Sequence, residues 1–252
     1  MQAVELVGDG VDGDFDGVVD ELSVGDITAL SVYTAAQPRP VTTPELASLG
    51  LIPPLSTAQQ SAIARGAARF HDVACDTCHT PTLPLRDALF SEPSQNPSYR
   101  DAVFPAGQDP RARGVDPALP ITFDLTRDIP TNRVAVGGQT IALGNHISNG
   151  TGGAIISLYG DLKRHDMGAR LAEPLDDDGV PASVFLTENL WGVGTTAPYL
   201  HDGRATTLTE AILAHGGEAA ASRGAFAGLP TASQLDVIAF LDSLVLYKAP
   251  GS

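Results

Sequence analysis

The sequence has few cysteines, few cations and no long apolar run. Its 252 residues include two cysteines and one tryptophan, and 15 lysines and arginines stand against 30 aspartates and glutamates. The net charge of −15 argues against nucleic acid as a partner, because contacts with phosphate require Lys and Arg. No apolar run reaches membrane-spanning length, so we expect no membrane span. Hydrophobic residues make up 43% of the chain, which is enough for a folded core.

Both cysteines lie in the segment VACDTCHTPT, and a histidine follows the second one directly. A thioredoxin-like redox pair would need a strand before it, but the upstream residues LSTAQQSAIARGAARFHDVA are typical of a helix. A zinc site would need two more ligands at short spacing, and the sequence has no third cysteine and no paired histidine motif. The CxxCH pattern therefore predicts one haem c, bound covalently by Cys75 and Cys78, with His79 as an iron ligand.

The predicted haem indicates where the protein works. Haem c is attached outside the cytoplasm, so we expect a periplasmic or extracellular protein. The first residues, MQAVELVGDG, have neither the positive segment nor the apolar segment of a signal peptide. We therefore interpret the sequence as a mature form or as part of a longer chain.

An acidic loop near the N-terminus, DGVDGDFDGVVDELS, follows the pattern of a calcium-binding loop up to its ninth position. Gly17 falls at the sharp turn, but Ser23 stands where a bidentate Glu is expected. Crowded carboxylates repel one another unless a cation or water separates them, so the loop predicts Ca²⁺, with a solvated acidic turn as the alternative. The predicted calcium ligands are Asp12, Asp14, Asp16, the Val18 carbonyl and Asp20.

Two amphipathic helices frame the predicted fold. Ser56 and Gln59 form a capping box before the helix that precedes CxxCH, and Thr231 and Gln234 do the same for a C-terminal helix. Two crossing helices of this kind predict a mainly α fold with a class I-like cytochrome c core. We expect an acidic, calcium-loop-like segment over residues 1–50 and the cytochrome c domain over 51–252.

A large loop-rich insertion is predicted within that domain, at about residues 81–200. It contains three segments with the alternation of short strands, ITFDLT, NRVAVGGQTIAL and AIISLYGDLKRH. The middle segment predicts a hairpin that turns at Gly137–Gly138.

The iron held by His79 needs a ligand on its other face. His71 is too near the attachment site in sequence to reach that face. The remaining candidates are the Met167 sulfur and the imidazoles of His146, His165, His201 and His215.

Two segments, LKRHDMGARLAE and FLTENLWGVGTTAPYLHDGRATTLTEAILAHGGEA, resemble the C-terminal haem domain of the bacterial di-haem cytochrome c peroxidase superfamily. Within it, KRHDMG, LWGVG, PYLHDGRA and HGGEA are most similar to the di-haem oxidoreductase (thiol oxidoreductase) branch. The segments DGDFDGVVDELSVGDITAL and AAQPRP also recur in that branch, so the resemblance covers nearly the whole chain.

The resemblance implies roles for residues around the haem. In the peroxidases the sixth ligand lies fourteen residues after the HDG histidine, which corresponds here to His215 after His201. Thr207 and Glu210 predict a capped helix that presents His215 in its last turn, and Met167 is the alternative ligand. The remaining cofactor contacts that we expect are His201 as a hydrogen-bonding residue near a propionate, Arg204 as a propionate partner, and Trp191 in the core or at the haem edge.

Full-length members of the family carry two CxxCH motifs, whereas this sequence carries one and matches the C-terminal, electron-transfer half. The resemblance implies a mono-haem domain that carries electrons through a six-coordinate haem to a redox partner protein, such as another haem domain or subunit. One alternative is a peroxidase or oxidase that acts at this haem through a weak or open distal position. Another is a calcium-stabilised module whose haem is structural.

Overall fold

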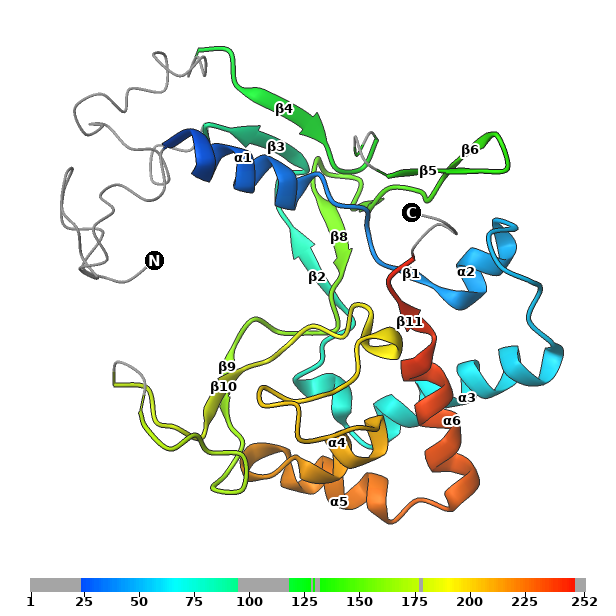
Figure 1. The fold of residues 1–252 in the computed structure, drawn as a ribbon, viewed down its shortest axis with the longest axis vertical. Coiled ribbons are helices and arrows are strands. Elements are labelled where there is room, and N and C mark those ends of the chain that lie inside the picture. Colours follow the sequence, from blue (N-terminus) through cyan, green and yellow to red (C-terminus); the bar gives the residue numbers. More distant parts are fainter. Residues whose placement is uncertain (1–23, 95–117, 128, 130–131, 177–178, 248–252) are drawn as a thin grey trace. The chain divides into compact units, whose positions relative to one another are not determined.

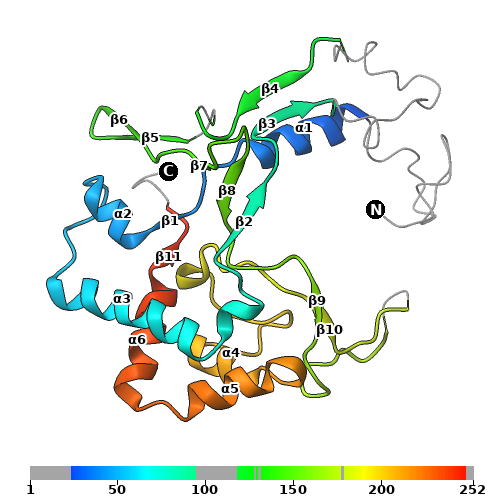
Figure 2. The same cartoon turned by 180° about the vertical axis from the view of Figure 1, so that it is seen from behind.

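The computed structural model describes residues 24–94, 118–127, 129, 132–176 and 179–247. The chain divides into two compact units, which are considered separately (Figures 1 and 2). The predicted calcium residues, Asp12 to Asp20, lie outside the described residues. Unit 1 contains Met1–Pro38, Leu85–Arg133 and Gly144–Ala154, and unit 2 contains Arg39–Pro84, Val134–Leu143 and Ile155–Ser252.

The prediction of a mainly α, class I-like cytochrome c core with an inserted loop region is wrong. Only 34% of the structure is helical, 20% is strand, and the strands form many small sheets. Two of the helices in the described part have only six and seven residues. Glycine-rich turns and short alternating segments favour paired strands over helix, so sheet structure holds together much of the chain between the helices.

Unit 1 packs one helix beside a two-stranded antiparallel sheet. Phe90 and Phe123 lie opposite each other on the two strands, with ring centroids 4.8 Å apart, and Ile129 is almost fully buried. This pair extends the apolar contact between the strands. The elements of unit 1 are α1 (Val24–Ala35), β3 (Leu89–Glu92), β4 (Ile121–Asp124) and β7 (Ile147–Ser148).

Four of the helices of unit 2 contribute to its main apolar core, whereas Leu46 of the helix Thr43–Ser48 belongs to a second cluster with Val41, Leu51, Leu143 and Val245. Both predicted crossing helices are present, as α3 (Thr57–Asp72) and α6 (Thr231–Asp242), and they lie against each other in both ribbon views (Figures 1 and 2). The core residues are Phe70, Leu208, Phe226, Val237, Phe240, Leu241 and Leu244. The helices are α2 (Thr43–Ser48), α3 (Thr57–Asp72), α4 (Leu208–Ala214), α5 (Ala220–Ala227) and α6 (Thr231–Asp242).

Capping explains where two of these helices start. The predicted capping boxes of Ser56 with Gln59 and of Thr207 with Glu210 are both confirmed. The box predicted for Thr231 is wrong, because the helix begins at Thr231 itself after Pro230, and no side chain caps it. The Gln234 amide instead donates hydrogen bonds to carbonyls at the end of α5 and just beyond it.

The strands of unit 2 form small pairs, of which β1 with β11 and β9 with β10 are antiparallel. The predicted hairpin is confirmed, since Gly137 and Gly138 both adopt positive φ angles, of 58° and 79°, at its turn. The pairs are β1 (Val41–Thr42) with β11 (Leu244–Val245), β2 (Thr82–Leu85) with β8 (Ala154–Ser157), β5 (Arg133–Val136) with β6 (Gln139–Ala142), and β9 (Arg164–Asp166) with β10 (Val184–Leu186).

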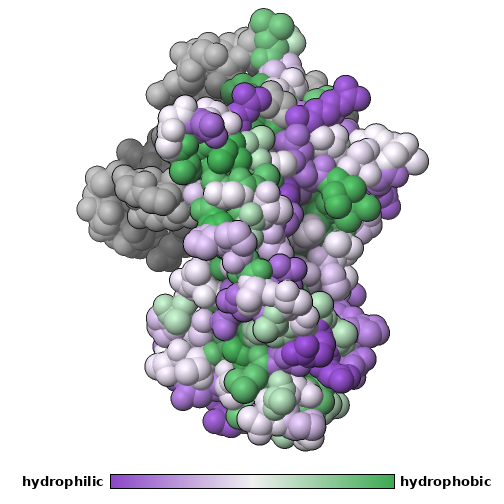
Figure 3. All heavy atoms as spheres, turned by 90° about the vertical axis from the view of Figure 1, so that its right-hand side faces the viewer, coloured by the Kyte–Doolittle hydropathy of each residue, from purple (hydrophilic) through white to green (hydrophobic). Residues whose placement is uncertain are grey.

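The surface carries both polar and apolar residues. Figure 3 shows hydrophilic and hydrophobic residues interspersed on the face towards the viewer. In the part of the chain that the structure describes, no helix has the length and apolarity that crossing a membrane would require.

Candidate functional site

A pocket of about 670 Å³ in unit 2 brings together most of the residues that the sequence predicts at the cofactor. Its size and largely apolar lining are typical of a cofactor site. Arg204 is not among the lining residues, because its guanidinium pairs with Asp202 and donates to the Arg170 carbonyl. The predicted residues that line the pocket are Cys75, Cys78, His79, Met167, Trp191, His201 and His215.

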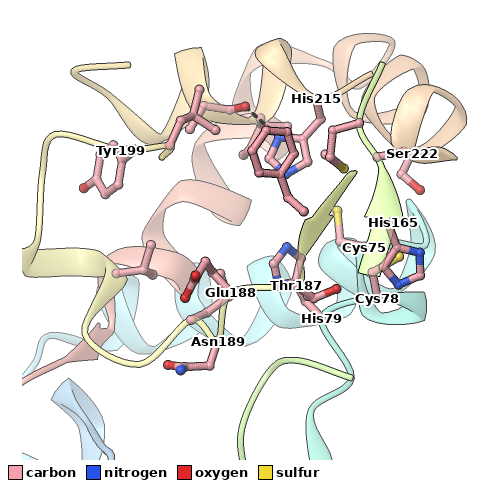
Figure 4. Close-up of a pocket in the computed structure, with 18 of the residues that line it drawn as sticks. Cys75, Cys78, His79, His165, Thr187, Glu188, Asn189, Tyr199, His215 and Ser222 are labelled. Atoms are coloured by element: carbon pink, nitrogen blue, oxygen red, sulfur yellow. Dashed lines mark hydrogen bonds between the residues drawn. The ribbon is translucent and has the colours of Figure 1, made fainter. Parts of the chain in front are cut away.

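The end of α3 turns the two cysteines towards the pocket. The helix ends at Asp72, and Ala74 adopts a left-handed conformation with φ of 59°. This reversal leads into a short 3₁₀ turn, Cys75–Thr77, and the His79 amide donates to the Cys75 carbonyl over 3.0 Å. A tight turn therefore places both thiols and the imidazole on the same pocket (Figure 4).

The His79 ring is held on the side away from the pocket. Its Nδ1 lies 3.1 Å from the Tyr159 carbonyl oxygen. A carbonyl only accepts, so in this contact Nδ1 carries the proton and Nε2 keeps the lone pair that a metal would use. The Glu188 backbone also hydrogen-bonds this ring. Phe70 packs against the same ring at a centroid distance of 6.4 Å. Tyr159 has a φ of 53°, an uncommon conformation for a residue with a side chain.

The His215 ring, at the end of α4, is held in a similar way. It is the residue that caps the C-terminus of α4, one position beyond the last turn in which the sequence places it. Its Nδ1 lies 2.7 Å from the Ala211 carbonyl oxygen, so this ring also keeps the Nε2 lone pair free. Leu208 and Ala211 are buried on the same helix, and their burial fixes the direction in which the His215 side chain points.

The rings of His79 and His215 face each other across the pocket (Figure 4). Their centroids are 6.4 Å apart, with an interplanar angle of 58°. A metal–imidazole bond is about 2 Å long and the centroid lies roughly 1 Å beyond the nitrogen, so two imidazoles on one metal have centroids roughly 6 Å apart. The observed separation fits a single iron between the two rings.

The protonation states also suit ligation. Burial lowers the pKa of both His79 and His215, so both rings are neutral near neutral pH, as ligand imidazoles must be. Burial raises the pKa of the Cys75 thiol to about 11 and also raises that of Cys78. Folded, the two thiols are therefore poor nucleophiles, which does not favour a redox-active pair.

Met167, the alternative ligand, also lines the pocket and directly follows β9. Its backbone lies close to the chain that follows His215, since a Cβ on Gly216 would lie 2.7 Å from the Met167 carbonyl oxygen. The two candidate ligands are thus carried by backbone segments in contact.

His201 and Trp191 are fixed by local contacts. The His201 ring stacks on Phe185, with centroids 4.5 Å apart and an angle of 23°. The Trp191 indole N–H donates to the Ser157 carbonyl. Trp191 is half-buried and the His201 side chain is 25% exposed, and both line the pocket, where an aromatic ring can pack against a flat cofactor.

The sequence did not predict one hydrogen-bond network at the pocket, which is centred on His165. His165 lies between two carboxylates, with Nδ1 2.8 Å from Glu218 and Nε2 2.9 Å from Asp161. The motifs KRHDMG and HGGEA contain His165 and Glu218, but nothing in either motif alone indicates that they meet. Their pairing depends on the fold, which brings β9 beside the turn after His215.

The C-terminal part of the chain matches a known protein family. Residues 131–244 match the family described as di-haem oxidoreductase, putative peroxidase. This segment is similar to the di-haem oxidoreductase family. The resemblance stated from the sequence motifs is therefore confirmed for the C-terminal part of the chain. Searches among curated proteins and among solved structures gave no match.

The di-haem oxidoreductase match covers one side of the pocket. It includes Met167, Trp191, His201 and His215, whereas the CxxCH motif of residues 75–79 precedes it. The family indicates a haem-dependent oxidoreductase function. Among the residues that the structure describes, no group of three or more His, Cys, Asp or Glu side chains could hold a bare metal ion.

Proposed function

We propose that this chain is a c-type cytochrome domain that carries electrons through one covalently bound haem. Cys75 and Cys78 would form the thioethers, and His79 and His215 would be the axial ligands. The predicted Ca²⁺ and a redox partner protein, such as another haem domain, belong to the same proposal, as does a location outside the cytoplasm, where haem c is attached.

The observation that supports the proposal best is the pairing of His79 with His215. Two neutral imidazoles, each with its Nδ1 proton held by a backbone carbonyl, face each other at a separation that suits one iron. A hydrogen bond donated by the other ring nitrogen orients a ligand imidazole and increases its basicity. The adjacent thiols of the CxxCH motif add the covalent attachment that this motif provides.

When bound, the haem supplies a one-electron Fe(III)/Fe(II) couple. The Tyr159 and Ala211 carbonyls hold the two imidazoles in one orientation, so neither ring needs to reorganise. Phe70 and the apolar core beneath it exclude water from the His79 side. If His79 and His215 both bind the iron, no position would remain for peroxide, which favours electron transfer over peroxide chemistry.

The absorption spectrum of the air-oxidised holoprotein tests the ligand assignment. We expect a low-spin ferric haem whose near-infrared charge-transfer band is that of two nitrogen ligands, with no methionine–iron band at the red end of the visible. His215→Ala should give a high-spin haem that binds cyanide, and Met167→Ala should leave the spectrum unchanged.

Two results would contradict the assignment. If Met167→Ala removed a sulfur band while His215→Ala changed nothing, Met167 would be the ligand and a higher potential would be expected. If the wild-type protein were already high-spin, a peroxidase or oxidase with an open distal position would be the better reading.

A further inference from the structure

Two backbone segments at the pocket touch through glycine residues. A Cβ on Gly217 would lie 2.0 Å from the Asp166 carbonyl oxygen and 2.8 Å from the Gly168 nitrogen. In the other direction, a Cβ on Gly168 would lie 2.9 Å from the Gly217 nitrogen. Real Cβ atoms do not approach backbone this closely, so the contact exists only because both positions are glycine.

Glu218 holds the same two segments together by hydrogen bonds. One of its carboxylate oxygens accepts from the Asp166 amide over 3.0 Å. The other lies 2.8 Å from Nδ1 of His165. A charged side chain and a main-chain contact therefore join β9 and the residues after it to the turn at Gly217–Ala219.

This junction lies immediately beside His215. Helix α4 ends at Ala214, and the His215 backbone already has a non-helical ψ of 136°. Beyond Ala214, the helix no longer constrains the direction of the chain. The glycine contact begins one residue later, at Gly216 against the Met167 carbonyl. Helix α4 holds His215 from one side, through hydrogen bonds of its amide to the Ile212 carbonyl and of its ring to the Ala211 carbonyl, and the segment 216–218 holds it from the other.

We propose that the contact between Gly168 and Gly217, with Glu218, is a positioning element that holds the His215 ring at the iron. The inference rests on the proposed function, since it concerns the ligand that His215 supplies. Because the contact is between main-chain atoms, a side chain at Gly217 must push the two segments apart. That displacement moves His215 relative to His79 and opens the position to an added ligand or to Met167.

The test compares Gly217→Ala with Gly138→Ala in the haem-loaded protein. Gly138 also has a positive φ, of 79°, but its Cβ would meet nothing within 4 Å, so it reproduces the backbone strain without the clash. Gly217→Ala should lose the two-nitrogen near-infrared band and bind cyanide about tenfold more tightly, because the fraction of protein with an open iron rises. Gly138→Ala should match the wild type in both measurements.

A second variant covers the case in which Gly217→Ala does not fold. The Glu218 side chain is 57% exposed, so Glu218→Ala should fold, and it should show a smaller increase in cyanide affinity. If the wild type shows two nitrogen ligands but both variants keep its spectrum and cyanide affinity, the positioning role is overturned while the proposed function stands. If the wild type itself lacks a two-nitrogen haem, the proposed function fails and the inference fails with it.

Discussion

The carbonyl oxygen of Asp236 lies where the side chain of Gly66 would begin. A Cβ on Gly66 would come within 1.9 Å of this oxygen and 2.8 Å of the Phe240 Cβ. Helices α3 and α6 therefore meet backbone to backbone at this point, and a bidentate ion pair from Arg65 to Asp236 flanks the contact at 2.8 Å. The crossing fixes the end of α3, from which the cysteines follow.

Gly66→Ala should destabilise unit 2 strongly. The methyl group cannot be accommodated without separating the helices, and overpacking of this kind costs about 1–3 kcal/mol or more. Chemical denaturation measures the loss. Gly224→Ala is the matched control on α5, where a Cβ meets nothing within 4 Å, and it should stabilise the protein by about 0.5–1 kcal/mol. Equal stabilities for the two variants would contradict the predicted clash.

Haem should remain attached to the chain after denaturation. Denaturing electrophoresis with a haem peroxidase stain should give a band that disappears when Cys75 and Cys78 are both replaced by alanine. Thr77→Ala is the control between them, because it changes a side chain of the same turn, whose hydroxyl donates to the Ala74 carbonyl, and leaves both thiols in place. A stained band in the double variant would refute covalent attachment through these residues.

The His165 network should make stability depend on pH. Hydrogen bonds with Glu218 and Asp161 raise the pKa of His165. Burial alone would raise the pKa of Asp161, but hydrogen bonds from His165, the Lys163 amide and Thr187 lower it to about 2. Because the pKa of His165 is raised, its protonation stabilises the fold below pH 6.5, and this stabilisation is lost as pH rises through the pKa of the folded state. Because the pKa of Asp161 is lowered, its ionised form stabilises the fold above pH 3.8, and this stabilisation is lost as pH falls towards 2.

The wild type should therefore exceed His165→Gln in stability by more at about pH 5.5 than at about pH 8.5. Thermal denaturation of both proteins at the two pH values measures this difference. His71→Gln serves as the control, because that ring is 78% exposed and its pair with Asp76 is screened by solvent. A stability difference for His165→Gln that is the same at both pH values would rule out the linkage.

The calcium loop remains a prediction from the sequence. If Asp12, Asp14, Asp16, the Val18 carbonyl and Asp20 bind Ca²⁺, EDTA should lower the melting temperature and excess Ca²⁺ should restore it. Elemental analysis of the purified protein provides the independent measurement. An unchanged melting temperature together with no bound metal would mean that the loop is only an acidic turn.

Local sequence signals predicted local structure well. The capping residues Ser56 and Thr207 start their helices, and Gly137–Gly138 forms the hairpin turn. The overall class could not be read in the same way, since two crossing helices are compatible with many surroundings. How many short strands pair between them depends on contacts between distant segments, and local propensity does not encode these contacts.

At the candidate site, too, local sequence predicted the residues but not the contacts between distant segments. Cysteine spacing singled out Cys75 and Cys78, and the family motifs singled out His215, without any knowledge of the fold. The carbonyl of Tyr159 could not be predicted, because every residue has a carbonyl and only the fold selects which one meets His79. The glycine contact at Gly217 was equally hidden, since a glycine pair in sequence says nothing of what lies against it.

The hydrogen bond between His79 and Tyr159 joins residues 80 positions apart, and the Arg65–Asp236 pair joins residues 171 positions apart. Contacts of such long range form slowly, because a large loop must close before they stabilise the chain. Cys75 packs against the core to which α6 contributes, and burial raises the pKa of its thiol to about 11, so the thiol lacks this effect until the core has formed. A nascent chain therefore passes through a period in which its thiols are accessible and reactive. The rate at which distant parts of the chain come into contact determines how long the thiols can react.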